Sequence, residues 1–418
     1  MPCITSEMMI WRLAWRNLLR RRRRTLLTAF SVGGGMWVAL TFTGITNYSL
    51  ADMLNTSAQM GLGHVTIEPT GFLDSPSAAK RFAMDGRQLA AAGTAPGVTR
   101  AIPRIMAEGM IATASKTVGG SLIGIDPARE SAGYNFFLKS MVSGRLFPRA
   151  EESGVVVGAK LAEKLNLKIG KKLVYTTTDV NGNIVSELAR VTGIFQTGSD
   201  AADGAIILLP IDKLRRLLGY AEKEVTLVAV FLDSERHAEK VRSAIASHAF
   251  PGTETWIWNE TQAEIAGAIA IKRTSNAFFE FFIGLLVAAG ILDTILTGVL
   301  ERKHEFGVML AVGSSPGFLF RMVLMESFFI GALGIALGVL INLPFYIYLS
   351  HWGYDLSSFL PPGYEVNRVP IEYVIKVIYY PEDITGIAAV IFILTLLAGL
   401  YPAWKASRIP PVESIRVT

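Results

Sequence analysis

The side chains that could do unusual chemistry in this sequence are carboxylates inside or beside long apolar runs. Glu280 and Asp293 lie within the apolar run 278–300, and Glu326 stands just before the apolar run 327–350. A carboxylate in a membrane span costs about 2.5–3.5 kcal/mol on insertion scales, so we expect each to face water, a neighbouring helix or another protein. These intramembrane acids could form a proton or substrate site, or hydrogen bonds between helices.

The sequence surroundings of the three carboxylates differ. Asp293 has no basic partner in its run, which favours a hydrogen bond to a Ser, a Thr or the backbone of a neighbouring helix over a proton relay. Glu280 lies near one end of its run, where its side chain can reach water. Glu326 could pair with Arg321 or Arg302, and an ion pair and an unpaired interfacial charge fit the pattern equally well.

Motifs for catalysis or metal binding are absent from the sequence. It contains no G-x-x-x-x-G-K-[ST] phosphate-binding loop, no H-E-x-x-H pair and no G-x-S-x-G nucleophile turn. The five histidines are scattered without the spacing of metal ligands, and the one cysteine, Cys3, cannot form an internal disulfide. We therefore expect a protein that is not an enzyme and that holds no cofactor or metal of its own.

A charged and then apolar segment, ERKHEFGVMLAVGSSP, occupies residues 301–316 between two of the apolar runs. Ser315 followed by Pro316 is typical of an N-cap and the first residue of a new helix. The preceding part predicts a short docking helix at the membrane surface, whose apolar stripe inserts into a partner and which Gly313 ends. The stripe recurs at helical spacing and consists of Phe306, Met309, Leu310 and Gly313.

Four apolar runs are long enough to cross a bilayer, which takes about 20 residues. The chain is 51% hydrophobic and 18% charged, too apolar for an ordinary soluble domain and too polar for membrane spans alone. We therefore expect a membrane protein in which one helix precedes a folded domain, at 47–275, and three helices follow it. The predicted spans are 25–46, 278–300, 317–350, which Pro344 should kink or end, and 384–404.

The distribution of lysine and arginine predicts the orientation of the spans. Basic residues cluster before the first run, after the fourth run, and at Arg302 and Lys303 between the second and third runs. The segment 351–383, between the third and fourth runs, is poorer in them. Both termini, including the tail 405–418, and the segment 301–316 are therefore expected in the cytoplasm, with the large domain outside.

An interfacial helix is expected over residues 1–24. Tryptophans prefer headgroup depth and arginines bind lipid phosphates, so this segment is predicted to anchor the chain at the membrane surface. An arginine run could also bind nucleic acid, but its position beside an apolar run argues for lipid and against nucleic acid here. The anchor residues are Trp11 and Trp15 at helical spacing, followed by Arg20, Arg21, Arg22, Arg23 and Arg24.

The segment 47–275 predicts an α+β domain that is large enough for a core of its own. Asn181 with Gly182 predicts a hairpin turn, and helices are expected at 159–165, 211–218 and 235–248. Two lobes with a break near 133–144 would fit the alternation of strands and helices. Apolar and β-branched runs bounded by Gly, Pro or Asp predict strands at 63–69, 121–126, 154–158, 171–179, 189–195, 204–210 and 226–233.

Four segments together resemble the FtsX-like permeases of ABC transporters, in particular the MacB-type and lipoprotein-releasing (LolC/LolE-like) branch. WRLAWRNLLRRRRRTLLT at 11–28 is similar to that family's entry helix and first span. GVVVGAKLAEKLNLKIGKKLVY at 154–175 resembles its periplasmic core domain. ERKHEFGVMLAVGSSP at 301–316 resembles its coupling helix, and GLYPAWKASRIPPVESIR at 399–416 resembles its C-terminal signature.

The resemblance implies a MacB-like periplasmic core domain followed by an FtsX-like permease domain over about 278–412. It implies that the segment 301–316 is the coupling helix, which sits in a groove of the ATPase. Asp293 departs from the family's pattern, which more often has Asn there. The coupling residues of the E-R-x-x-E-[IF]-G-x-x-x-A-[VLM]-G pattern and its apolar face are Glu301, Glu305, Phe306, Gly307, Leu310 and Gly313.

The resemblance also implies the partners and the location of the protein. Two copies of a separate ATPase, which binds ATP and Mg²⁺, would dock from the cytoplasm on a pair formed with a second copy or a sister permease. The location would be the bacterial inner membrane, with a periplasmic carrier or a membrane-fusion protein as a further partner. The implied function is ATP-driven extraction of a lipoprotein or another lipid-anchored substrate from the outer leaflet.

Three alternatives remain open at this point. A MacB-like permease uses the same architecture to push a periplasmic substrate into an outer conduit. A division-type FtsX regulator would activate periplasmic enzymes without transport, but it generally has a smaller external domain than 47–275. A membrane sensor should carry a cytoplasmic output domain, which is not expected in this sequence after the fourth span.

Overall fold

The computed structural model describes residues 2–20, 22–147, 153–246, 251–359, 365–366, 369–370 and 373–410. The chain divides into two compact units. The helical unit comprises Met1–Ser49, Ile271–Asp355 and Val374–Thr418, and the α/β unit comprises Leu50–Ala270 and Leu356–Tyr373. In the segment 351–383, between the third and fourth apolar runs, the short strands β13 (Tyr354–Asp355) and β16 (Val374–Ile375) pair with each other.

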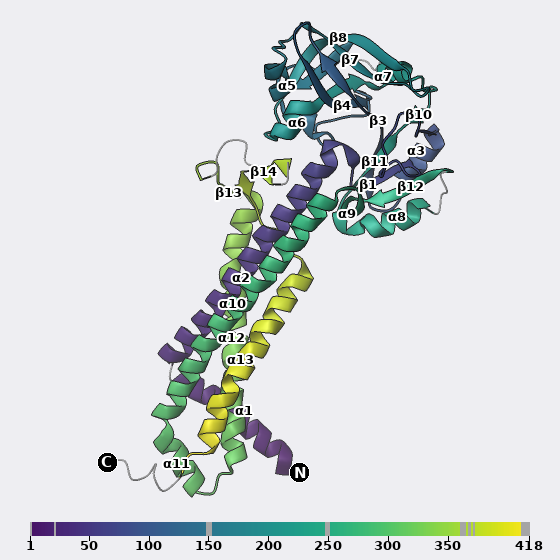
Figure 1. Ribbon diagram of the computed structural model, residues 1–418. Coiled ribbons are helices and arrows are strands. Elements are labelled where there is room, and N and C mark those ends of the chain that lie inside the picture. The colour runs from purple at the N-terminus through teal and green to yellow at the C-terminus, as the bar shows by residue number, and fades with distance from the viewer. Residues whose placement is uncertain are drawn as a thin grey trace. The chain divides into compact units, whose positions relative to one another are not determined.

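The helical unit is built from long apolar helices and two shorter ones (Figure 1). Within the described residues, four helices are long and apolar enough to cross a membrane, one near the N-terminus and three later in the chain. This confirms the predicted arrangement of one span and then three. The helices are α1 (Pro2–Arg20), α2 (Arg22–Ser57), α10 (Ala263–Glu301), α11 (Lys303–Ala311), α12 (Pro316–His351) and α13 (Pro381–Ser407).

Two of the spanning helices are longer than a bilayer requires. α2 has 36 residues and α10 has 39. At 1.5 Å per residue each is more than about 50 Å long, whereas the hydrocarbon core is about 30 Å thick. Both therefore continue into segments that the sequence analysis assigned to the external domain. An apolar stripe explains the continuation, because within the α/β unit Leu50, Met53 and Leu54 pack against Ile265 and Ile269.

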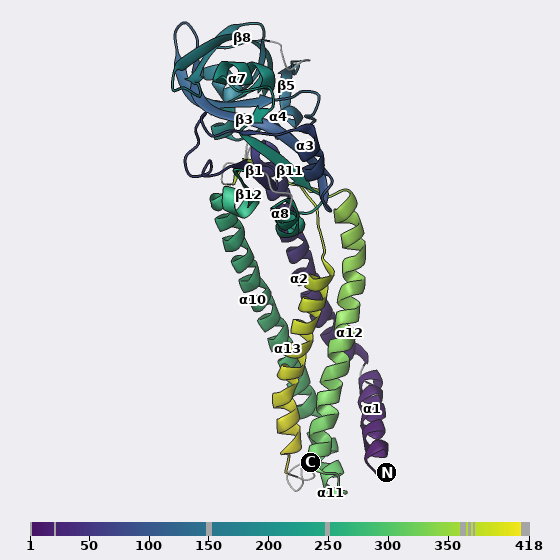
Figure 2. The ribbon, with the colours of Figure 1, turned by 90° about the vertical axis from the view of Figure 1, so that its right-hand side faces the viewer.

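Glycines allow close contact between α2 and α12. A Cβ atom on Gly33 would lie 3.0 Å from the carbonyl oxygen of Gly334, and one on Gly334 would lie 2.5 Å from Val32. A Cβ on Gly338 would lie 2.9 Å from the carbonyl oxygen of Gly33. At this helix contact backbone therefore packs directly on backbone. α13 runs beside α12, as Figure 2 also shows.

The α/β unit contains a mixed sheet of ten strands in the part of the chain that the structure describes. The strand order is β12-β1-β11-β3-β4-β9-β6-β8-β5, with β7 paired to β3 and β8. β4 and β9 are parallel, as are β6 and β8, and the other pairs are antiparallel. The strands of this sheet are β1 (Val65–Pro69), β3 (Val98–Ala112), β4 (Thr117–Ile125), β5 (Met141–Gly144), β6 (Gly154–Gly158), β7 (Lys172–Thr178), β8 (Ile184–Phe195), β9 (Ile206–Pro210), β11 (Leu227–Leu232) and β12 (Thr253–Ile257). Separate two-stranded sheets pair β2 (Phe82–Ala83) with β10 (Glu224–Val225), and β14 (Glu365–Val366) with β15 (Val369–Pro370).

Helices cover this sheet and enclose its main apolar core. The seven predicted strands and the hairpin turn at Asn181 and Gly182 are confirmed, and so are the three predicted helices over the residues described. Residues 247–248, the end of the predicted third helix, lie outside the described residues. The helices are η1 (Ala58–Leu62), α3 (Gly86–Gly93), α4 (Phe136–Lys139), α5 (Ala159–Lys164), α6 (Asp200–Ala205), α7 (Ile211–Leu218), η2 (Glu235–His237), α8 (Ala238–Ala246) and α9 (Trp258–Thr261).

The long strand β3 joins the two halves of the sheet. Its first part pairs with β11 from Val98 to Arg104, and its second part pairs with β4 from Ile105 to Ala112. The halves therefore meet inside β3 and not near 133–144, where the sequence suggested a break. At the junction the buried Arg104 guanidinium binds both carboxylate oxygens of Glu130, at 2.7 and 2.9 Å.

Candidate functional site

α11 is a short helix between two membrane-spanning helices, at one end of the helical unit (Figure 1). α10 ends at Glu301, Arg302 occupies the N-cap position of α11 without a side-chain capping hydrogen bond, and Gly313 takes a positive φ of 103° after the helix. The Ser315 side chain then accepts a hydrogen bond from the Phe318 backbone N–H, and Pro316 is the first residue of α12. The predicted N-cap and Pro start are confirmed.

The apolar stripe of this helix faces the inside of the helical unit. The Phe306 side chain is 0% exposed and belongs to the apolar core formed by the spanning helices. Gly307 is buried, and Met309 and Leu310 pack against the same core. The expectation that Phe306 inserts into a partner is therefore wrong. Amphipathic spacing identifies an apolar face, but it does not tell which body that face packs against.

The opposite face of α11 is exposed and carries a different set of residues. Val312 is 83% exposed and Val308 is 41% exposed, large fractions for apolar side chains on an otherwise charged surface. Three polar residues of α11, Lys303, His304 and Glu305, are also exposed. We call these five residues the α11 outer face. Apolar side chains surrounded by charged ones are typical of a protein contact surface.

Arg302 links α11 directly to α12 and, through Glu326, to α1. Its guanidinium forms ion pairs with Glu326 of α12 at 2.8 Å and with Glu305 at 3.1 Å, and lies 4.7 Å from the centre of the Phe306 ring. Glu326 also accepts a hydrogen bond from the Asn17 side chain of α1 at 2.9 Å. Of the two partners considered for Glu326, the structure therefore selects Arg302.

The electrostatics of Arg302 follow from these contacts. Burial by itself lowers the pKa of its guanidinium, but Glu326 and Glu305 outweigh that effect and hold the pKa above its ordinary value. The group is therefore a permanent cation that joins α1, α11 and α12. Because Arg302 and Glu326 are 11% and 14% exposed, their ion pair is partly withdrawn from solvent, and loss of one partner would leave an uncompensated charge.

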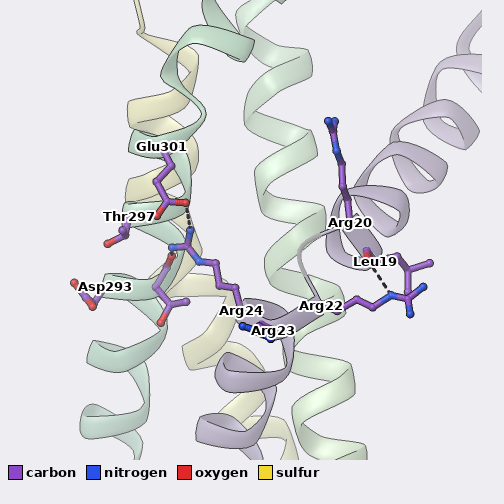
Figure 3. Close-up of a pocket in the computed structure, with 9 residues that line it drawn as sticks. Leu19, Arg20, Arg22, Arg23, Arg24, Asp293, Thr297 and Glu301 are labelled. Atoms are coloured by element: carbon purple, nitrogen blue, oxygen red, sulfur yellow. Dashed lines mark hydrogen bonds and ion pairs between the residues drawn. The ribbon is translucent and has the colours of Figure 1, made fainter.

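A second ion pair joins the start of α2 to the end of α10. Arg24 pairs with Glu301 at 2.9 Å and donates a hydrogen bond to the Thr294 carbonyl oxygen. Its guanidinium lies over Gly298, where a Cβ atom would be 3.0 Å from Nη1. Figure 3 shows Arg24 reaching α10, whereas Arg22 turns back to the Leu19 carbonyl. Sequence reasoning could not find this pair, because its members are 277 residues apart.

The arginines and Asp293 line one hollow of about 750 Å³ (Figure 3). Asp293 is exposed there, and it makes no hydrogen bond or ion pair with the residues that the structure describes. The predicted hydrogen bond to a neighbouring helix is therefore not found within the described chain. Arg21 lies outside the described residues. The hollow brings together the acid and the basic run that the sequence reasoning treated separately, and its lining is Leu19, Arg20, Arg22, Arg23, Arg24, Asp293, Thr294, Thr297 and Glu301.

The two predicted anchor tryptophans lie on α1 and are half-exposed, at 47% for Trp11 and 48% for Trp15. Their rings contact the aromatic side chains of α12: Trp11 lies 5.3 Å from Phe329, and Trp15 lies 5.2 Å from it. α1 is thus held against α12 on one side and presents indole surface on the other. Their role at the lipid headgroups stays a prediction.

Glu280 of α10 does not simply extend toward water. Its carboxylate accepts hydrogen bonds from the Thr43 hydroxyl of α2 at 2.6 Å and from the Asn276 side chain at 2.7 Å. It lies toward the end of the helical unit away from α11, where α13 begins. Among the described residues, no group of three or more His, Cys, Asp or Glu is arranged to hold a metal ion.

Comparison with known protein families gives two matches that together cover most of the chain. The model of the MacB-like periplasmic core domain matches residues 25–248, and the model of the FtsX-like permease C-terminal domain matches residues 277–411. The second match contains α10 from residue 277 onward and the whole of α11, α12 and α13, and so it includes the α11 outer face.

Individual relatives are distant but span much of the chain. The lipoprotein-releasing system transmembrane protein LolC of Xylella fastidiosa is 21% identical over 78% of this chain and 80% of its own length. The macrolide export ATP-binding/permease protein MacB 2 of Aeromonas hydrophila is 24% identical over 97% of this chain and 60% of its own length. The crystal structure of the periplasmic region of MacB from Actinobacillus actinomycetemcomitans covers 51% of this chain with 14% identity and a TM-score of 0.36.

Proposed function

This chain belongs to the FtsX-like permeases with a MacB-like periplasmic core domain and is an ABC transporter permease, and we propose that a separate ATPase chain drives it. The sequence has no phosphate-binding loop, so ATP and Mg²⁺ would be bound by that partner. The match to permeases of bacteria supports a location in the inner membrane, and the bias of Lys and Arg supports both termini and α11 in the cytoplasm. The α/β unit would then be periplasmic.

The observation that carries this proposal is the α11 outer face. A short helix between two spans has one face packed into the spanning helices and another exposed, with Val308 and Val312 in water. Arg302 fixes its position relative to α1 and α12. A partner that binds this face could therefore transmit a movement to several helices at once, as a coupling helix must.

The substrate that fits best is a lipoprotein or another lipid-anchored molecule, released from the outer leaflet of the inner membrane. The match to a lipoprotein-releasing relative over 78% of the chain supports this choice. The match to a macrolide exporter over 97% of the chain supports a second candidate, export of a periplasmic substrate by closure of the external domains. Both candidates require a second permease protomer and two ATPase copies.

Paired substitutions on the α11 outer face test the proposal. Val308→Asp with Val312→Asp places charges where a partner surface would desolvate them, without touching the buried Phe306. We expect co-purification with the partner ATPase to weaken at least about tenfold, because loss of a hot-spot residue at the centre of an interface costs about 2 kcal/mol or more. Ile184→Asp is the matched control, since Ile184 is 80% exposed on β8 of the α/β unit.

Insertion into the membrane and the elution profile of the purified chain should be unchanged in all variants. If the Val308→Asp, Val312→Asp chain retains the ATPase as the Ile184→Asp chain does, α11 is not the docking element. Reconstitution with the ATPase then separates the two substrate candidates, by asking whether a lipoprotein or a periplasmic molecule stimulates hydrolysis.

A further inference from the structure

A second hollow, of about 300 Å³, lies within the helical unit at the end where α13 begins. Three spanning helices, α2, α10 and α13, contribute to it. One end carries carboxylates, and the remaining wall is apolar. A volume of about 300 Å³ is at the lower end of the range for small-molecule pockets. We call it the α13 hollow, and its lining is Ala39, Thr43, Glu280, Ile283, Gly284, Glu382, Asp383, Gly386, Ile387, Val390 and Ile391.

Two carboxylates at the acidic end of the α13 hollow, those of Glu280 and Asp383, accept hydrogen bonds from neutral side chains. Glu280 accepts its hydrogen bonds from Thr43 and Asn276, which are neutral groups. Asp383 accepts one from the neutral side chain of Asn47 at 2.6 Å. Two carboxylates beside an apolar wall repel each other and lose hydration, so a cation that enters between them gains from both effects.

The wall beyond the carboxylates provides space as well as apolar surface. A Cβ atom added to Gly386 would meet nothing within 4 Å, so the side of α13 next to Asp383 is open. Ile283, Ile387 and Val390 line the hollow further from the carboxylates. An alkyl chain placed there would be removed from water at a gain of about 0.8 kcal/mol for each buried CH₂ group.

We propose that the α13 hollow binds an amphipathic cation, with an ammonium group between Glu280 and Asp383 and an alkyl chain along α13. The charge complementarity selects a molecule with net positive charge over a zwitterionic phospholipid, because the phosphate of a phospholipid would meet the same carboxylates. The role of the α13 hollow as an entry site for substrate rests on the proposed permease function, whereas the binding of a cation to the hollow does not depend on that function. The substrate class is then a cationic, membrane-partitioned amphiphile.

Equilibrium binding of radiolabelled dodecyltrimethylammonium to the full chain in phosphatidylcholine nanodiscs tests the proposal. We expect a saturable component of about one molecule per protomer above the partitioning into empty nanodiscs. The neutral isostere 2,2-dimethyltetradecane and the zwitterionic dodecylphosphocholine should compete at least about tenfold more weakly, since the first lacks the charge attracted by the carboxylates and the second carries a phosphate that they repel. Equal competition by dodecylphosphocholine would assign the hollow to phospholipid headgroups and overturn the proposal.

Substitutions then locate the bound cation. Glu280→Gln with Asp383→Asn should weaken binding at least about tenfold, and Gly386→Leu should abolish it by filling the open side. Gly386→Ala fills less space and favours the helix, so an intermediate loss there excludes misfolding as the cause. Two control variants change residues outside the α13 hollow: Asp293→Asn removes another carboxylate from α10, and Gly317→Leu fills open space on α12. Both variants should bind dodecyltrimethylammonium with the affinity of the wild type.

Unchanged affinity in the Glu280→Gln, Asp383→Asn chain and in the Gly386→Leu chain would overturn the assignment. This outcome is distinguishable from a failure of the proposed function. If the chain does not bind the cation but the ATPase still docks on α11, the proposed cation site is wrong and the proposed permease function stands. If the chain binds the cation but the ATPase does not dock on α11, the cation site stands and its role in ATP-driven transport is wrong.

Discussion

At the residue scale, burial and pairing assign roles that residue type alone leaves open. Arg302 and Glu326 are both charged and both near a membrane end, yet together they join three helices. Asp293 is a charged residue of the same region, but it faces an open hollow beside arginines. The difference is geometric, because a partly buried ion pair holds its helices in place whereas an exposed carboxylate is free to meet a further partner.

Glu68 of β1 gives the clearest pH dependence in the α/β unit. Its side chain is 2% exposed, its Oε1 atom has no hydrogen-bond partner among the described residues, and it lies opposite Glu254 of β12. Burial, with smaller contributions from the charges of Glu254 and Asp74, raises the pKa of Glu68 to about 7, although the Leu73 N–H opposes the shift. Since the folded state binds the proton more tightly than the unfolded state, stability falls as pH rises from about 4.5 through about 7.

We therefore expect the melting temperature of the α/β unit in the full chain to fall between pH 5 and pH 8. The cost of ionising Glu68 is about 2 kcal/mol, which corresponds to about 5 °C for a unit of this size. Glu68→Gln should remove most of that fall, whereas Glu163→Gln, an exposed glutamate on α5, should leave it as in the wild type. A Glu68→Gln chain with the full wild-type pH dependence would contradict the account.

At the element scale, helix contacts depend on the absence of side chains at particular points. Gly334 lets α12 approach Val32 of α2, and Gly338 lets it approach Met36. Each contact fixes how the first span sits against the third, and so how α1 and α11 are held at the end of the unit. At these glycines a small increase in side-chain volume should have a large effect on the stability of the helical unit.

Gly334→Val should destabilise the helical unit by about 1–3 kcal/mol, because the added side chain meets Val32 Cβ at 2.5 Å and the α2 backbone cannot retreat without losing other contacts. Thermal unfolding in detergent measures this, with Gly317→Val as the control at a glycine that has open space. If both variants melt at the same temperature, close packing of α2 on α12 is not a source of stability.

The sequence predicted most elements and missed those whose pattern is mixed. β6 and β9 are short apolar runs bounded by Gly or Pro, and both were predicted. β3 was missed because it contains Pro103, Arg104 and Gly109, which break the usual alternation. Arg104 belongs to a strand because Glu130 and the backbone satisfy its charge, and a long-range partner of this kind is not visible in a local pattern.

The candidate site shows the same limit. Residue spacing correctly predicted α11 between two spans, and it correctly predicted Ser315 as the N-cap of the next helix, α12. It could not show that Phe306 packs inward, since the core that receives it comes from α10, α12 and α13. Three-dimensional packing therefore moves the predicted docking surface from the apolar stripe to the α11 outer face.

At the scale of the whole molecule, the chain combines a unit of spanning helices with an α/β unit, and α2 and α10 contribute residues to both. In our proposal, ATP hydrolysis moves α11, Arg302 passes that movement to α1 and α12, and the spanning helices pass it onward.

The central claim is that a separate ATPase binds the α11 outer face. Photo-crosslinking of the full permease–ATPase complex tests it most directly, with a photoreactive amino acid placed at Val312 and, as the control, at the equally exposed Ile184. We predict an ATPase crosslink from position 312 that Val308→Asp abolishes, and none from position 184. Absence of an ATPase crosslink from position 312 in a complex that hydrolyses ATP would contradict the claim.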